Sequence, residues 1–183
     1  MRLLLPLLLL ACLWARPALA WQQAPWQNKL LSISTGLDYS HAWQPAGSQL
    51  LGPYDRAVPY FGLQTLLRPV AVDFRVAFDR TVDLTAGWAQ PVHSTWNGWF
   101  VLTGMLVGRA AGREYSAPNL RTGTDHRFNF TLGPALRAEF LGYGAAWSVF
   151  LEARQMVFEP VETSVGLGVS FSPLAILQWR ERY

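Results

Sequence analysis

The chain has 183 residues, and its formal net charge of +3 at pH 7 gives no support to a nucleic-acid-binding role. Cys12 is the only cysteine and lies in a segment that we expect to be removed. A disulfide or a cysteine-based metal site is therefore excluded in the mature chain. The remaining length suits a single domain.

The N-terminus has the three parts of a secretory signal peptide. Arg2 supplies a short positive region, Leu3 to Leu10 form a leucine-rich core, and Ala18-Leu19-Ala20 is an A-x-A cleavage site. The apolar run is well short of the ~20 residues that a membrane-spanning helix needs. We expect residues 1–20 to be a signal peptide and Trp21 to begin the mature protein.

A second interpretation of the same segment stays open. Leu9-Leu10-Ala11-Cys12 resembles a lipoprotein processing box, in which Cys12 would be the lipidated residue. Against it, the apolar stretch continues through Leu13 and Trp14, where a lipoprotein usually turns polar. We expect residues 21–29 to be a short periplasmic segment ahead of the folded domain.

Period-two alternation of apolar with small or polar residues continues through the rest of the chain. In 70–78, Val72, Phe74 and Val76 alternate with Asp73 and Arg75. Such a strand has large apolar groups on one face and charges on the other, which indicates two different environments. Eight segments are expected to be strands: 31–39, 61–67, 70–78, 81–88, 99–107, 128–140, 147–154 and 161–171.

An even number of antiparallel strands closes a barrel with both termini at the same end. We expect an all-β, up-and-down transmembrane barrel over residues 30–172, with the termini on the periplasmic side. The two longest connections, 43–57 and 109–125, then both lie outside, as outer-membrane barrels require. Their Gly, Pro, Asn and Ser content is typical of loops.

This pattern resembles the small eight-stranded outer-membrane barrels, the class that contains the OmpA transmembrane domain and OmpX. The resemblance covers residues 30–171 and matches no particular family within the class. It implies location in the cell outer membrane, contact with its lipids and lipopolysaccharide, and a lumen narrow enough for side chains to fill. A wide diffusion porin is excluded on that basis.

The last expected strand carries a short motif, Ser164-x-Gly166-x-x-Val169-x-Phe171. It resembles the β-signal that outer-membrane barrels present to the barrel-assembly machinery, and it implies that this machinery inserts the chain. Such signals usually end the chain, whereas residues 173–183 continue here. That tail is expected either to lie on the periplasmic membrane surface or to form a further strand.

Aromatic residues are expected to form two girdles, because their rings favour the membrane–water interfaces. The expected outer girdle consists of Tyr39, Trp43, Tyr60, Phe61, Phe78 and Phe128, and the periplasmic one of Trp88, Trp99, Phe140, Trp147 and Phe171.

The alternation sends six carboxylates and three guanidinium groups into the lumen. They are Asp38, Asp73, Arg75, Asp83, Arg137, Glu139, Glu152, Arg154 and Glu162. These charges are expected to pair, because an unpaired buried charge costs several kcal/mol. A packed polar core is the favoured interpretation, and a gated path for ions or protons is the alternative.

A lipid A-modifying acyl hydrolase or transferase would need a base near a hydroxyl nucleophile at the membrane edge. His126, with Glu114 and Ser116 in the preceding loop, is the only plausible base. His41 follows Ser40 on a strand, so their side chains point to opposite faces. A rim histidine without catalytic function is the favoured interpretation of His126, and no cofactor or metal site is expected.

The sequence thus favours an integral outer-membrane barrel with a structural or surface-interaction role through loops 43–57 and 109–125. The partner of these loops is unknown. Besides the lipid-modifying enzyme and the narrow ion channel, a periplasmic lipocalin-like binding barrel remains as an alternative. It would have the reverse packing, with large apolar residues inside.

Overall fold

A computed structural model describes residues 29–43, 50–51, 55–67, 69–95, 98–116, 124–142, 145–158 and 161–174. The expected signal peptide with Cys12, residues 21–28 and residues 175–183 of the tail lie outside the described residues.

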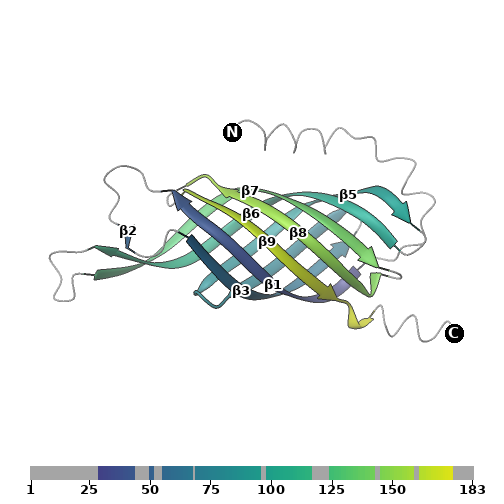
Figure 1. Cartoon of the computed structure of the whole chain (residues 1–183), viewed down its shortest axis with the longest axis horizontal. Helices are drawn as coiled ribbons and strands as arrows, with labels where there is room; N and C mark the ends of the chain where they lie inside the picture. Colours follow the sequence, from purple (N-terminus) through teal and green to yellow (C-terminus); the bar gives the residue numbers. More distant parts are fainter. Residues whose placement is uncertain are drawn as a thin grey trace.

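The described part of the chain contains nine strands, and Figure 1 shows how they are arranged. They are β1 (Lys29–Trp43), β2 (Leu50–Leu51), β3 (Asp55–Leu67), β4 (Val70–Ala77), β5 (Thr81–Thr95), β6 (Gly98–Ser116), β7 (Thr124–Gly142), β8 (Trp147–Met156) and β9 (Val161–Phe171). No helix in the described part of the chain is long and apolar enough to cross a membrane.

Eight of these strands close into an antiparallel barrel. The order is β6-β5-β4-β3-β1-β9-β8-β7, and the pairing of β6 with β7 completes the circle. The two-residue strand β2 is additional, because it pairs only with β6, at Leu50↔Tyr115 and Leu51↔Glu114. The expected eight-stranded up-and-down barrel is confirmed.

The barrel has two different ends, visible at the left and right of Figure 1. The loop end carries the connections 44–54, 78–80, 117–123 and 157–160, and the turn end carries 68–69, 96–97 and 143–146. At the β4–β5 connection the backbone of Arg80 has a φ of 66°, in the left-handed region that tight turns use.

Alternation along each strand sorts the side chains into an apolar exterior and a polar interior. In β8 and β9 every second residue is buried from one end of the strand to the other. Leu37, Leu151 and Leu167 lie in register on neighbouring strands and are 50%, 53% and 59% exposed. The intervening positions carry mostly Ser, Gly, Asp, Glu and Arg. The large apolar residues therefore face outward, as a strand between lipid and a packed lumen requires.

Two small apolar clusters lie inside the barrel and explain why β6 is apolar on both faces. One consists of Leu66, Ala71, Ala89, Val101 and Leu141, with Trp99 packed against it, and the other of Met105, Val107, Ala135 and Met156. The interior residues of β6 line these clusters while Phe100 and Leu106 face outward.

The strands are longer than the sequence analysis expected, and the loops are correspondingly shorter. Residues 109–116 and 124–125 belong to β6 and β7, so most of the segment 109–125 is strand. The segment 43–57 contains β2 and the first residues of β3. The expected loop boundaries were wrong because Gly108 to Gly112 lacks large apolar residues, so the alternation is not visible there.

The β6–β7 pair extends beyond the rest of the barrel (Figure 1). Thr81, the first residue of β5, pairs with Ala111, whereas β6 and β7 continue to pair as far as Ser116↔Thr124. Because a β-strand rises ~3.4 Å per residue, residues 112–116 have a length of about 17 Å along the strand. We call residues 112–116 and 124–128 the hairpin extension.

Tyr60 does not belong to the outer aromatic girdle. Its side chain is 1% exposed and lies inside the barrel. The neighbouring Phe61 is 55% exposed and packs against Phe78, with ring centroids 5.9 Å apart. Tyr60 has the same strand parity as Gly62 and Gln64, which face the lumen, and this parity decides its position.

Candidate functional site: the charged lumen and the loop end

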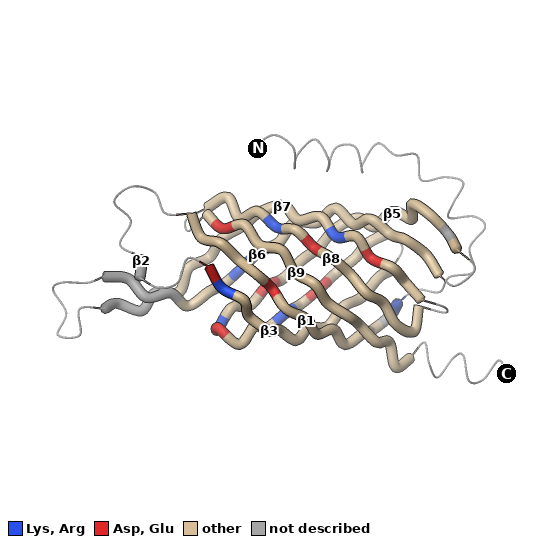
Figure 2. The backbone as a smooth tube through the Cα atoms, viewed as in Figure 1, with Lys and Arg blue, Asp and Glu red and all other residues tan. Residues whose placement is uncertain are grey.

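Charged residues occupy positions along the length of the barrel (Figure 2). The central group is built around Glu152, which is fully buried. Its Oε2 accepts hydrogen bonds from Arg75 Nη2 at 2.7 Å and from Arg137 Nε at 2.6 Å, and its Oε1 accepts one from Arg154 Nε. Asp73 closes the group, since Arg75 and Arg137 both donate to its Oδ2.

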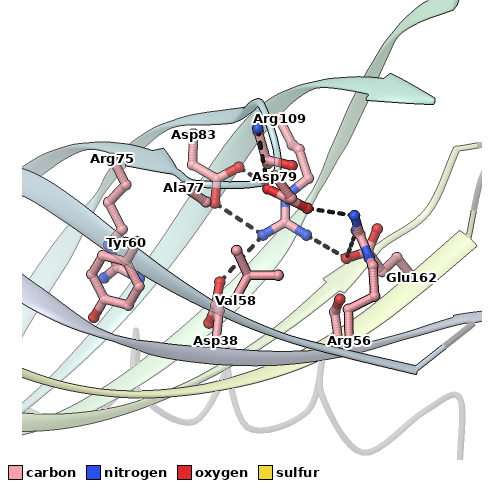
Figure 3. A pocket seen from close by; sticks show the side chains of 12 residues that line it. Asp38, Arg56, Val58, Tyr60, Arg75, Ala77, Asp79, Asp83, Arg109 and Glu162 are labelled. Atoms are coloured by element: carbon pink, nitrogen blue, oxygen red, sulfur yellow. Dashed lines mark hydrogen bonds and ion pairs between the residues drawn. The ribbon is translucent and has the colours of Figure 1, made fainter. Parts of the chain in front are cut away.

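Nearer the loop end, a second group is built around Arg109 (Figure 3). Its Nε and Nη2 donate to Asp83 Oδ1 and Oδ2 at 2.8 and 2.9 Å, which is a bidentate pair. Its Nη1 donates to Glu162 Oε1 at 2.6 Å. Arg154 joins this group to the central one, because its Nη1 donates to Asp38 and Asp83.

Arg56 lies at the rim of the lumen, where it is 15% exposed. It pairs with Asp79 and lies 3.6 Å from Glu162. Arg56, Asp38, Asp83 and Arg109, among others, line a small cavity of about 20 Å³. That volume holds about one water molecule, so this end of the lumen is filled by ion pairs.

Aromatic rings and glycines fill the middle of the lumen. Tyr60 lies under the Arg75 guanidinium, whose carbon is 4.7 Å from the ring centroid, and Phe150 lies 4.7 Å from that of Arg137. A Cβ atom at Gly168 would overlap both the Tyr60 hydroxyl and the Phe150 ring, and one at Gly36 would meet the same hydroxyl 2.6 Å away. Only glycine leaves room for these rings.

At the turn end, Lys29 forms a third group with Glu139. The Lys29 ammonium lies 2.8 Å from Glu139 Oε1 and 3.1 Å from both Gln64 Oε1 and Ser148 Oγ, and it also bonds Ser170 Oγ. Lys29 is 1% exposed.

The structure places all nine sequence-derived lumen residues inside the barrel and brings them into these three groups. They are Asp38, Asp73, Arg75, Asp83, Arg137, Glu139, Glu152, Arg154 and Glu162. Sequence reasoning missed Lys29, Arg56 and Arg109. Arg109 was assigned to a loop, although it is odd-numbered, like most of the other buried residues of β6. In the described part of the chain, no group of three or more His, Cys, Asp or Glu side chains could hold a metal ion.

His126, Glu114 and Ser116 all belong to the hairpin extension. In the β6–β7 register Glu114 lies opposite His126, and Ser116 lies opposite Thr124. The backbone therefore brings the first two positions together. Their side chains lie outside the described residues, so the proposed hydrolase geometry stays a prediction.

A different histidine has a carboxylate partner on the exterior of the loop end. His41 Nδ1 lies 2.7 Å from Asp55 Oδ1, which also accepts a hydrogen bond of 3.0 Å from the Tyr39 hydroxyl. His41 also packs edge-on against Trp43. Asp55 is well exposed, as suits polar groups at the level of lipid headgroups.

The residues of the β-signal-like motif lie in β9 and divide between its two faces. Ser164 and Gly166 face the lumen, while Val169 and Phe171 face outward at 36% and 54% exposure. Phe171 pairs with Trp147 of β8 and with Ile33 of β1. The motif therefore lies at the seam where the first and last strands meet, and its role in assembly stays a prediction.

Comparison with solved structures finds similar chains, and the first of those below shows the same architecture. The chain is similar to neisserial surface protein A, with a TM-score of 0.51, 10% identity, and coverage of 78% of this chain and 96% of that one. Ail of Yersinia pestis, crystallised with the heparin analogue sucrose octasulfate, gives a TM-score of 0.48, 14% identity, and coverage of 77% and 96%. The N-terminal barrel domain of Pseudomonas aeruginosa OprF gives a TM-score of 0.38 and 11% identity, with coverage of 79% of this chain and 98% of that one. No protein-family model and no curated protein matches the chain.

The chain has the fold of the small outer-membrane β-barrels. Its own surface requires a lipid environment, because large apolar side chains are exposed on all eight barrel strands. A closed barrel satisfies every ladder hydrogen bond internally, which allows strands to cross a bilayer. The outward apolar belt and the polar interior are the arrangement of an outer-membrane barrel and the reverse of a lipocalin-like one.

Proposed function

We propose that this protein is a surface-interaction protein of the outer membrane and that the hairpin extension is its contact element. The observation that carries the proposal is the length of β6 and β7. β6 pairs with β5 only as far as Ala111, which lies opposite Thr81, the first residue of β5, whereas β6 and β7 continue to pair as far as Ser116↔Thr124. A transmembrane scaffold needs only ~9–11 residues in each strand, so 19-residue strands exceed that requirement.

The filled lumen supports a surface role over a channel. Glu152 and Arg109 each bridge groups from opposite sides of the barrel, and the Tyr60 and Phe150 rings occupy the space between. A solute would have to displace several buried ion pairs, and separating each one is strongly unfavourable. Contact with other molecules is then left to the loop end.

β2 gives the hairpin extension a defined shape. It pairs with β6 at Glu114 and Tyr115, beyond the last residue pair of β5 and β6. The extension is therefore a three-stranded element at this point, which suits the presentation of a fixed surface better than an isolated two-stranded hairpin would.

The test compares three forms displayed on a Gram-negative host: the native protein, a truncation in which Asn-Gly replaces residues 113–127, and a variant with those residues scrambled. Adhesion is measured to epithelial monolayers and to immobilised fibronectin, laminin and collagen. Folding of each form is checked by heat-modifiability on gels. The proposal predicts adhesion above the empty host for the native protein and loss of it in both folded variants. Adhesion equal to the empty host on every surface, or unchanged adhesion after truncation, overturns it.

A further inference from the structure

Lys29 is the single lysine of the chain, beside 14 arginines. It is the first residue of β1, and its ammonium group is buried at the turn end. Every other cation in the described part of the lumen is an arginine. Lys29 therefore differs in its chemistry from the other buried cations.

The backbone is irregular at this point, and the irregularity turns Lys29 inward. From Ser32 to Ser40, the even-numbered residues of β1 are the ones that face the lumen. Lys29 is odd-numbered, but the register shifts between Lys29↔Leu66 and Ser32↔Gln64. β-Bulges re-aim side chains in this way. Without the shift, Lys29 would point into lipid.

The groups around the ammonium come from four strands and also bond to one another. Gln64 lies on β3, Glu139 on β7, Ser148 on β8 and Ser170 on β9. Ser148 Oγ bonds Glu139 Oε1 and lies 2.7 Å from Ser170 Oγ. The oxygens of Glu139, Ser148 and Ser170 are therefore also linked by hydrogen bonds that do not involve Lys29. We call Gln64, Glu139, Ser148 and Ser170 the ammonium cradle.

Oxygen atoms from four side chains surround the nitrogen, so each of its three N–H donors has an acceptor and one donor is shared between two oxygens. This arrangement suits an ammonium group, which is a compact charge. A planar guanidinium spreads five donors over a larger fork and matches paired carboxylate oxygens instead. We propose that the cradle is a binding site for a primary ammonium group, which the chain fills with its own Lys29 to lock the closing seam of the barrel.

The position of Lys29 links occupancy of the cradle to closure. β1 is the first strand and β9 the last, so their pairing is the step that closes the barrel. Before that pairing, Lys29 is separated from Ser148 and Ser170, which lie 119 and 141 residues away in the chain. Only the closed barrel in the correct register brings the ammonium into the cradle.

The test is chemical rescue. Lys29→Ala is refolded into detergent micelles, and its unfolding rate is measured by tryptophan fluorescence and by the heat-modified gel band. Removing one partner of a buried pair is expected to raise the unfolding rate about 100-fold or more. Added n-butylammonium should reverse at least a tenfold part of this change. Tetramethylammonium, which has no N–H donor, and n-butanol, which has no charge, should not.

Two further variants keep the test decisive if Lys29→Ala does not refold. Lys29→Arg should unfold faster than the native protein. Lys29→Met combined with Glu139→Gln should be more stable than Lys29→Met alone, because it removes the carboxylate left without its cation. Native-like stability of Lys29→Arg, equal rescue by all three additives, or no gain in the double variant overturns the proposal. All readouts are unfolding rates or stabilities, so they do not depend on the proposed surface function.

Discussion

Replacing Glu152 by glutamine tests whether the charged lumen stabilises the barrel. Glu152 is fully buried and accepts hydrogen bonds from Arg75, Arg137 and Arg154. Glutamine has the same shape, so it creates no cavity. It replaces one acceptor oxygen by an NH₂ donor that faces guanidinium N–H groups, and it removes the negative charge that the three arginines share.

The structure sets the size of the effect. Breaking a buried ion pair by removing one partner costs ~3–5 kcal/mol. Each arginine keeps another carboxylate: Arg75 and Arg137 keep Asp73, and Arg154 keeps Asp38 and Asp83. The loss should therefore lie at the lower end, at about 3 kcal/mol in the free energy of unfolding.

Reversible unfolding in phospholipid vesicles, followed by tryptophan fluorescence against denaturant concentration, measures this quantity. Asp55→Asn is the matched control, because it removes a carboxylate whose partner His41 lies on the exposed exterior. The control should unfold at the native midpoint. If Glu152→Gln unfolds there as well, while its heat-modified gel band confirms a closed barrel, the lumen network does not stabilise the fold and the reasoning fails.

Three further predictions concern packing, the lipid belt and assembly. Gly168→Leu should not close, because its side chain would overlap Tyr60 and Phe150. Gly108→Leu should fold, because a Cβ atom there meets only Leu84 O and Leu132 Cδ1, at 3.9 and 4.0 Å. Equal heat-modifiability of the two variants would contradict the packing described. Leu167→Arg, at mid-height on the exterior, should lower the free energy of unfolding by ~2–4 kcal/mol in vesicles, and a loss near zero would mean that this face is not in lipid. Phe171→Ala should reduce the fraction of chain assembled in the outer membrane in cells while refolding in detergent stays close to native, and equal loss in both would identify a packing role instead.

Much of the fold and of the lumen followed from alternation alone. Asp73 and Arg75 lie between Val72, Phe74 and Val76, and a strand with such faces can place its charges only inside. The same alternation places Tyr60 on the inner face of its strand, together with Gly62 and Gln64. The general preference of aromatic rings for the interface suggested the wrong position, because the glycines that make room for the ring lie on other strands.

Lys29 and Arg109 could not be placed from the sequence, for two different reasons. A register shift moves Lys29 to the other face, and a shift of this kind arises from the pairing of β1 with β3. Arg109 lies in a stretch of Gly and Ala where the exterior positions carry no large side chains, so alternation disappears although the strand continues. In both cases, the face on which the side chain lies depends on the pairing with neighbouring strands.

The way the arginines share carboxylates has a consequence for how such a protein changes over generations. Arg154 bonds Glu152, Asp38 and Asp83, which stand on three different strands. A single replacement among them leaves several charged partners unpaired at once. An exterior leucine, in contrast, can be exchanged for another apolar residue with little loss of stability. Divergence should therefore proceed quickly on the lipid face and in coordinated sets inside. Lineages descended from one ancestor would come to hold differently arranged sets of lumen charges, with few intermediates between them.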